Sequence, residues 1–101
     1  MSESYRNFAE FYPYYLSEHR NRTCRRLHFV GTGLALLLLL LAFMTSTWSL
    51  LLAVPLVGYS FAWVGHVVFE RNRPATFRHP VYSLMGDLAM FRDILRGRIH
   101  F

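Results

Sequence analysis

The sequence predicts an all-α fold: an integral membrane hairpin of two transmembrane helices, flanked by amphipathic interfacial helices. No charged residue occurs between Phe29 and Phe69, although the 101-residue chain carries eleven arginines and six acidic residues. Two apolar runs fill this stretch, and each approaches the ~20 residues that a helix needs to cross about 30 Å of hydrocarbon. A helix also satisfies its whole backbone within lipid, which an open strand does not.

The two predicted spans cover residues 27–45 and 48–69, with a polar turn at Thr45–Ser49. A cleaved signal peptide explains the first run poorly, because the segment before it is too long and a second apolar run follows closely. A soluble protein explains the two runs no better, because little chain remains to cover two helices that are apolar all round.

The N-terminal segment, residues 1–26, is expected to lie at the membrane interface. Its aromatic side chains recur at helical spacing, and Pro13 is expected to bend or divide the helix. The side chains of this aromatic face are Tyr5, Phe8, Tyr12 and Tyr15.

The C-terminal segment, residues 70–101, is expected to lie at the same interface and to form one domain with the rest of residues 1–101. Residues 83–97 have the period of an amphipathic helix, with Ser83 as its N-cap and Gly97 at its end. The apolar stripe of this helix consists of Leu84, Leu88, Phe91 and Leu95.

The arginines predict the orientation of the hairpin. Five precede it, six follow it and none lies in the turn, so the positive-inside rule places both termini in the cytoplasm, at a bacterial inner membrane or the endoplasmic reticulum. Because the charges adjoin the membrane ends and no RNA-binding motif is present, we expect membrane lipid as a partner, and no nucleic acid. The single Cys24 excludes an intrachain disulfide and fits a reducing compartment.

Four of the five histidines are expected to converge at the cytoplasmic mouth of the hairpin. His28 lies 19 residues before Thr47 and His66 lies 19 after it. At ~1.5 Å per residue, both rise about 28 Å from the turn and come out level. His19 and His79 lie in the segments that enter and leave the hairpin on the same side.

This histidine set favours a metal site. Nitrogen and oxygen donors suit Fe(II), Zn(II), Mn(II) or Cu(II), although the spacing matches no standard zinc motif. Taken alone, each histidine has an ordinary explanation as a surface, interfacial or backbone-bonded residue. Glu70, one turn after His66 on the same helix face, adds a carboxylate to the set.

Three stretches carry a resemblance to a known family. They are Phe11–Gly31 (FYPYYLSEHRNRTCRRLHFVG), Gly65–Ala75 (GHVVFERNRPA) and His79–Asp87 (HPVYSLMGD). Together they resemble the small membrane-protein family typified by the yeast 2-hydroxy fatty acid dioxygenase of phytosphingosine breakdown. The resemblance covers almost the whole chain, and its most specific element is GHxxFExxxPA.

The resemblance implies a non-haem, Fe2+-dependent dioxygenase that carries out α-oxidation of a 2-hydroxy fatty acid with O2. By motif, its functional histidines correspond to His19, His28, His66 and His79. Four protein ligands would leave two octahedral positions, too few for a chelating substrate plus O2. Three alternatives remain: one histidine leaves the metal, the substrate binds through a single oxygen, or the ligand set is smaller than four.

Other roles follow from the proposed chemistry. Glu70 is expected at the catalytic site as a ligand, as a proton acceptor or, in the role we favour, as a residue that orients a histidine. The substrate carboxylate is expected to pair with an interfacial arginine, although each candidate also suits a lipid headgroup. The candidates are Arg25, Arg26, Arg71 and Arg73.

Two other classes of function remain open at this stage. The first is a bis-histidine haem protein, in which His28 and His66 would be the axial ligands. A Soret band would identify it. A non-catalytic membrane scaffold would use the amphipathic flanks to bind partners and would carry no stoichiometric iron. Self-association into a homo-oligomer is also open.

Overall fold

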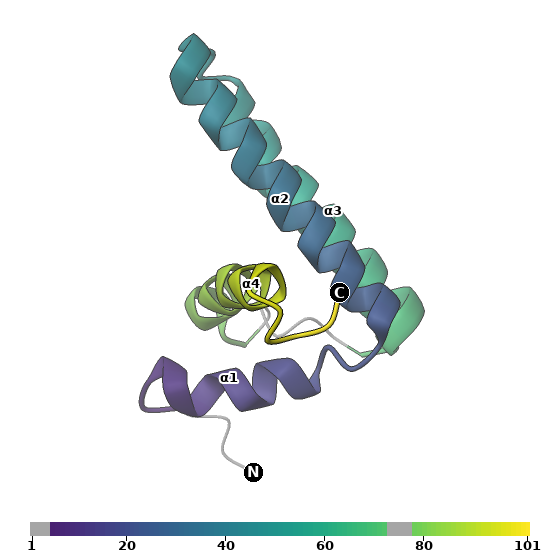
Figure 1. The fold of residues 1–101 in the computed structure, drawn as a ribbon. Coiled ribbons are helices and arrows are strands. Elements are labelled where there is room, and N and C mark those ends of the chain that lie inside the picture. The colour runs from purple at the N-terminus through teal and green to yellow at the C-terminus, as the bar shows by residue number, and fades with distance from the viewer. Residues whose placement is uncertain (1–4, 73–77) are drawn as a thin grey trace.

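The computed structural model describes residues 5–72 and 78–101, which form helices and connecting turns without a strand (Figure 1). The predicted all-α hairpin is confirmed. The helices are α1 (Phe8–Ser17), α2 (Arg22–Thr45), α3 (Leu50–Val64), the π-helix η1 (Gly65–Glu70) and α4 (Pro80–Leu95).

The long hairpin is made by α2 on one side and by α3 with η1 on the other (Figure 1). Arg22–Thr45 and Leu50–Glu70 are both long and apolar enough to cross a membrane. The first helix extends beyond the predicted span because Asn21 caps it, its side chain accepting hydrogen bonds from the Thr23 and Cys24 amides. Ser46 ends it in the left-handed conformation, with a φ of 53°.

Close contact between the hairpin helices depends on Gly31. A Cβ at this position would lie 2.6 Å from the Cβ of Phe61, which no packed side chain allows. The hairpin buries few of its large side chains, and leucines such as Leu40 and Leu52 remain exposed. An apolar surface of this extent is typical of a helix pair that faces lipid.

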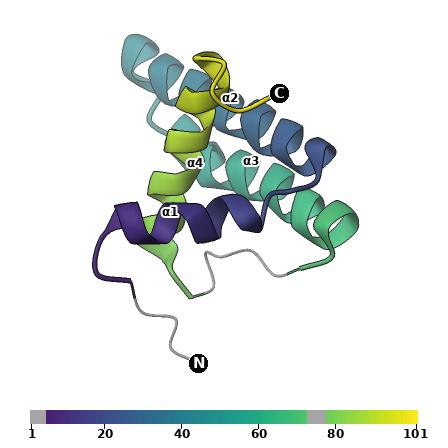
Figure 2. The same ribbon diagram turned by 60° about the horizontal axis from the view of Figure 1, so that its bottom comes forward.

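Helices α1 and α4 gather near the end of the hairpin that lies away from its turn (Figures 1 and 2). They share a small core of Phe11, Tyr15, Met90 and Ile94. Helix α1 runs through Pro13 without a division, so of the two expected outcomes, a bend or a division, the division is wrong. Phe11 and Tyr15, buried on either side of the proline, hold the backbone in place through their packing.

Helix α4 begins three residues earlier than predicted, and Ser83 is not its cap. Pro80 occupies the first turn, where its missing N–H costs no hydrogen bond. Gly97 follows the end of the helix with a φ of +77°, as expected for a terminating glycine.

The face that α4 buries is not the predicted leucine stripe. Gly86 lies so close to the Tyr15 ring that a Cβ there would approach it to 2.7 Å. Small residues therefore allow α4 to pack on α1, while Leu84, Leu88 and Leu95 remain exposed.

Candidate metal centre

The π-helix at the end of the second span shapes the candidate site. In η1 each amide bonds one residue further back than in an α-helix. This geometry is rare in proteins, and where it occurs it is often at a functional site. Arg71 ends η1 with a φ of 58°, and the amide of Asn72 then donates to the carbonyl of His66 at 3.0 Å. The chain thus folds back and places Asn72 beside the His66 ring.

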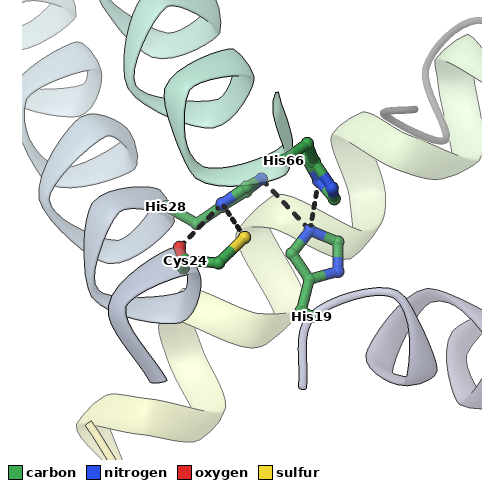
Figure 3. A group of neighbouring side chains, drawn as sticks. All are labelled: His19, Cys24, His28 and His66. Carbon is green, nitrogen blue, oxygen red and sulfur yellow. Dashed lines mark hydrogen bonds between the residues drawn. The ribbon is translucent and has the colours of Figure 1, made fainter. Parts of the chain in front are cut away.

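Three buried imidazoles meet where α2, η1 and the segment after α1 come together (Figure 3). His19 Nε2 lies 3.1 Å from His28 Nε2 and 2.9 Å from His66 Nε2. The predicted convergence of these three histidines is therefore present in the structure, and His19 lies between the two from the hairpin.

The other ring nitrogen of each histidine faces an oxygen acceptor. His19 Nδ1 donates to the Tyr15 carbonyl at 2.6 Å, and His28 Nδ1 donates to the Cys24 carbonyl at 3.0 Å. His66 Nδ1 lies 2.6 Å from Asn72 Oδ1. A carbonyl only accepts, so Nδ1 carries the proton in His19 and His28.

Asn72 fixes the same tautomer for His66. The amide nitrogen of Asn72 donates to the backbone carbonyl of Glu18 at 3.2 Å and to its carboxylate at 3.3 Å. This orientation leaves the amide oxygen facing His66, so Nδ1 of His66 is also the donor.

The hydrogen-bond pattern therefore gives three neutral imidazoles whose unprotonated Nε2 atoms point at one another. Lone pairs about 3 Å apart repel unless a cation lies among them, and the partners on Nδ1 are those that metal-binding histidines commonly have. Adjacent ligands of an octahedral ion at about 2.1 Å would also stand about 3 Å apart. The three histidines thus fit a divalent metal.

Cys24 completes the group of residues that could hold a metal ion. One ligand atom from each of His19, Cys24, His28 and His66 lies within 4.8 Å of the others. The Cys24 thiol is buried and its Sγ lies 3.7 Å from His28 Nδ1. Sequence reasoning gave Cys24 no role in the site, although its place one turn before His28 was a signal that was present.

The electrostatics around His19 favour a neutral ligand. Burial, with His28 and His66 adding to it, lowers the pKa of His19 well below its usual value. The Tyr15 ring stacks on His19 at 4.1 Å, and the Tyr15 hydroxyl donates to Asp87. Burial raises the pKa of Tyr15 well above its usual value, and it raises the pKa of Asp87 to about 6.

His79 lies apart from the three histidines. Its ring packs against Tyr5 and Phe11, with centroids 5.3 Å from each. His79 Nε2 is buried without a hydrogen-bond partner among the described residues. The structure therefore does not bring this predicted ligand to the site.

Glu70 contacts the N-terminal end of the first span. Its carboxylate accepts a hydrogen bond from the backbone amide of Asn21, the N-cap of α2. This bond ties the end of η1 to the start of α2, between His19 and His28 in sequence. The role of Glu70 at the site stays a prediction.

The predicted arginines differ in their surroundings. Arg25 donates to the carbonyls of His19 and Arg20 at 3.2 and 2.9 Å, and Arg26 donates to that of Phe101 at 3.1 Å. Arg71 is exposed. Arg73 lies outside the described residues. Of the four, Arg25 is joined directly to the segment that carries a site histidine.

The fold and the site define a class: a small helical-hairpin protein with a buried, histidine-rich group able to hold a metal at one end of the hairpin. Residues 5–99 match the family model described as 2-hydroxy-palmitic acid dioxygenase Mpo1-like, so the chain belongs to this family. The resemblance expected from the sequence is confirmed. No curated protein and no solved structure gives a significant match.

Proposed function

We propose that this protein is an Fe(II)-dependent dioxygenase that shortens 2-hydroxy fatty acids by one carbon at the cytoplasmic face of a membrane. The observation that carries the proposal is the convergence of three Nε2 atoms, with His19 Nε2 2.9 Å from that of His66 and 3.1 Å from that of His28. Membership of a family described by a 2-hydroxy-palmitic acid dioxygenase supports the substrate class and the reaction.

The reaction balances without a further cosubstrate. A 2-hydroxy acid, R-CHOH-COOH, reacts with O2 to give R-COOH, CO2 and water. The bond between C1 and C2 breaks, and the substrate supplies all four electrons that reduce O2. Neither a nicotinamide nor 2-oxoglutarate is needed, which fits a chain of this size.

In this proposal His19, His28 and His66 hold the iron. Bound iron supplies a Lewis acid for the substrate oxygens and a centre for the activation of O2. Three histidine ligands remove the difficulty of a four-histidine set, because they leave more of the coordination sphere open. The Nδ1 bonds to Tyr15, Cys24 and Asn72 keep the rings in place and their Nε2 atoms unprotonated.

Glu70 acts as a positioning residue. By accepting from the Asn21 amide, it fixes the turn that joins His19 to α2. Arg25 acts on the same turn through the carbonyls of His19 and Arg20. Its guanidinium is also the proposed partner of the substrate carboxylate at the membrane surface.

A membrane location suits an amphiphilic substrate. With both termini in the cytoplasm, the arginine-rich ends of the hairpin lie among lipid headgroups and the spans lie in hydrocarbon. The three histidines then lie near the boundary, where a fatty acid naturally places its polar head.

The test of this proposal is turnover by purified protein. Protein loaded anaerobically with Fe(II) is exposed to O2 and a long-chain 2-hydroxy acid, and the products are analysed by mass spectrometry. We expect the acid shortened by one carbon, with CO2 released in equal amount. The matching acid without the hydroxyl should not react. No shortening of any 2-hydroxy acid by fully iron-loaded protein would refute the proposal.

The haem alternative has weaker support. His19 Nε2 lies within 3.1 Å of both His28 Nε2 and His66 Nε2, so a porphyrin has no room between the two proposed axial ligands. A Soret band in the purified protein would restore this alternative. Purified protein without stoichiometric metal would instead favour the scaffold.

A further inference from the structure

A cavity of about 400 Å³ runs along the hairpin, with His28 of the candidate metal centre in its wall. Helices α2, α3 and α4 line it, and α4 crosses beside the hairpin at this level (Figure 2). His28 is the member of the candidate metal centre that lines it, so the cavity adjoins the centre through this side chain. Its volume lies in the range of pockets that hold small organic ligands.

The cavity has a polar end and an apolar end. His28 and Asp87 mark the polar end, while Leu36, Leu39 and Val54 belong to the part that extends toward the hairpin turn. This arrangement matches a molecule with one polar head and one hydrocarbon tail. A hollow of about 440 Å³ on the outer side of α3 contains none of the histidines.

Helix α2 supplies lining residues at increasing depth from His28. They lie 4, 7 and 11 residues further along, at Thr32, Ala35 and Leu39. At ~1.5 Å per residue they stand about 6, 10 and 16 Å from His28 along the helix axis. Gly58 of α3 lies level with Ala35, since a Cβ there would be 3.9 Å from the Ala35 Cβ.

We propose that this cavity holds the acyl tail of the substrate and that α2 measures its length. The inference rests on the proposed function and adds to it where the tail lies and which residues select it. The polar head of the acid lies at the His28 end of the cavity, and the tail runs past Thr32 and Ala35 toward Leu39.

The proposal gives substitutions along α2 a graded effect. A large ring at Thr32 blocks the cavity close to the head, so Thr32→Phe should reduce turnover of all but the shortest acids. Ala35→Phe should exclude long acids and spare medium ones, and Leu39→Trp should affect only the longest. Because forcing extra groups into a packed space is costly, we expect kcat/KM for an excluded acid to fall by at least about tenfold.

Leu40→Trp is the matched control, because Leu40 is exposed and is not part of the cavity wall. Each variant is compared on a series of 2-hydroxy acids of increasing length, with iron content measured alongside. The proposal requires the longest accepted acid to increase in the order Thr32→Phe, Ala35→Phe, Leu39→Trp. An unchanged length profile in an iron-loaded Ala35→Phe protein, or an equal shift in Leu40→Trp, would overturn it.

A binding measurement separates this proposal from the reaction. Two photoreactive 2-hydroxy fatty acids are used without O2, one with the diazirine near the head and one with it near the tail. The first should label residues around Thr32, and the second should label residues around Leu39 and Val54. Turnover without position-dependent labelling would refute the cavity assignment and leave the reaction intact. Position-dependent labelling without turnover would refute the proposed reaction and leave the cavity assignment intact.

Discussion

At the residue scale, the hydrogen bond made by Nδ1 of each histidine explains why its Nε2 is available to a metal. Three Nδ1 atoms donate to oxygens, so three Nε2 atoms are left with lone pairs that face one another in a buried space. Such an arrangement costs free energy unless a cation occupies it. The oxygens that accept from the Nδ1 atoms therefore matter as much for metal binding as the imidazole rings do.

Asn72 provides a direct test of that point. Asn72→Ala removes the acceptor for His66 Nδ1, and loss of such a partner typically weakens metal binding about 10- to 100-fold. Asn72→Asp keeps an acceptor for Nδ1 but loses the donor to Glu18, so it should retain more of the affinity than Asn72→Ala does. Iron affinity is measured by competition with a chelator. Equal affinity in Asn72→Ala and the unsubstituted protein would contradict the assignment.

The Asp87 carboxyl predicts a pH-dependent stability. Its pKa is raised to about 6 in the folded protein from a usual value near 4, so the folded state holds the proton more tightly than the unfolded state does. The contribution of Asp87 is therefore full below pH 4, and it is lost as the pH rises through 6. Asp87→Asn should raise the free energy of unfolding at pH 8 by about 3 kcal/mol, with little effect at pH 4. Thermal unfolding in detergent at the two pH values measures this, and an equal effect at both would rule it out.

Residue positions were only partly predictable from the sequence. Helix rise alone put His28 and His66 at one level, because depth in an antiparallel pair depends on counting from the turn. Asn72 and Cys24 were missed, since their contacts with the rings depend on how η1 folds back and on how closely Gly65 approaches Cys24. His79 was placed near the site by its segment, but its ring packs among aromatic side chains instead.

At the scale of elements, the π-helix η1 sets the geometry of the site. It positions His66, the amide of Asn72 and the carboxylate of Glu70 within one short segment. Apolar spacing predicted a helix here and gave no indication of its hydrogen-bond register. The face of α4 was also mispredicted, because packing on α1 selected Gly86, Met90 and Ile94 over the leucine stripe.

Deletion of one residue tests the role of η1. Val67 is exposed, so its removal loses little packing, but it shifts Glu70 and Asn72 by about 100° around the helix. We expect the deletion to abolish iron binding, while Val67→Ala retains it. Metal analysis of the two purified proteins gives the answer, and full iron in the deletion variant would show that the register of η1 is unimportant.

At the scale of the whole molecule, the hairpin separates a polar end from a long apolar body. Helices α1 and α4 lie toward one end of the hairpin, and the turn between α2 and α3 lies at the other (Figure 1). This gross plan followed from the charge-free stretch and the two apolar runs, because hydrocarbon leaves a chain little choice of backbone structure. The contacts between α1 and α4 could not be predicted from the sequence, because they depend on a small number of residues.

The plan makes a prediction about topology. Reporter tags at the two termini should both lie in the cytoplasm, and a tag in the Thr45–Ser49 turn should lie on the opposite side. The arginines on both flanks and their absence from the turn give the reason. Termini on opposite sides would be incompatible with a hairpin in the membrane.

Iron content of anaerobically purified variants tests the central claim most directly. The account predicts one iron per chain in the unsubstituted protein and in His79→Ala and His100→Ala. It predicts a nearly complete loss in His19→Ala, His28→Ala and His66→Ala, with insertion in the membrane retained, since each change removes a ligand. Full iron loading in any of these last three variants would contradict it.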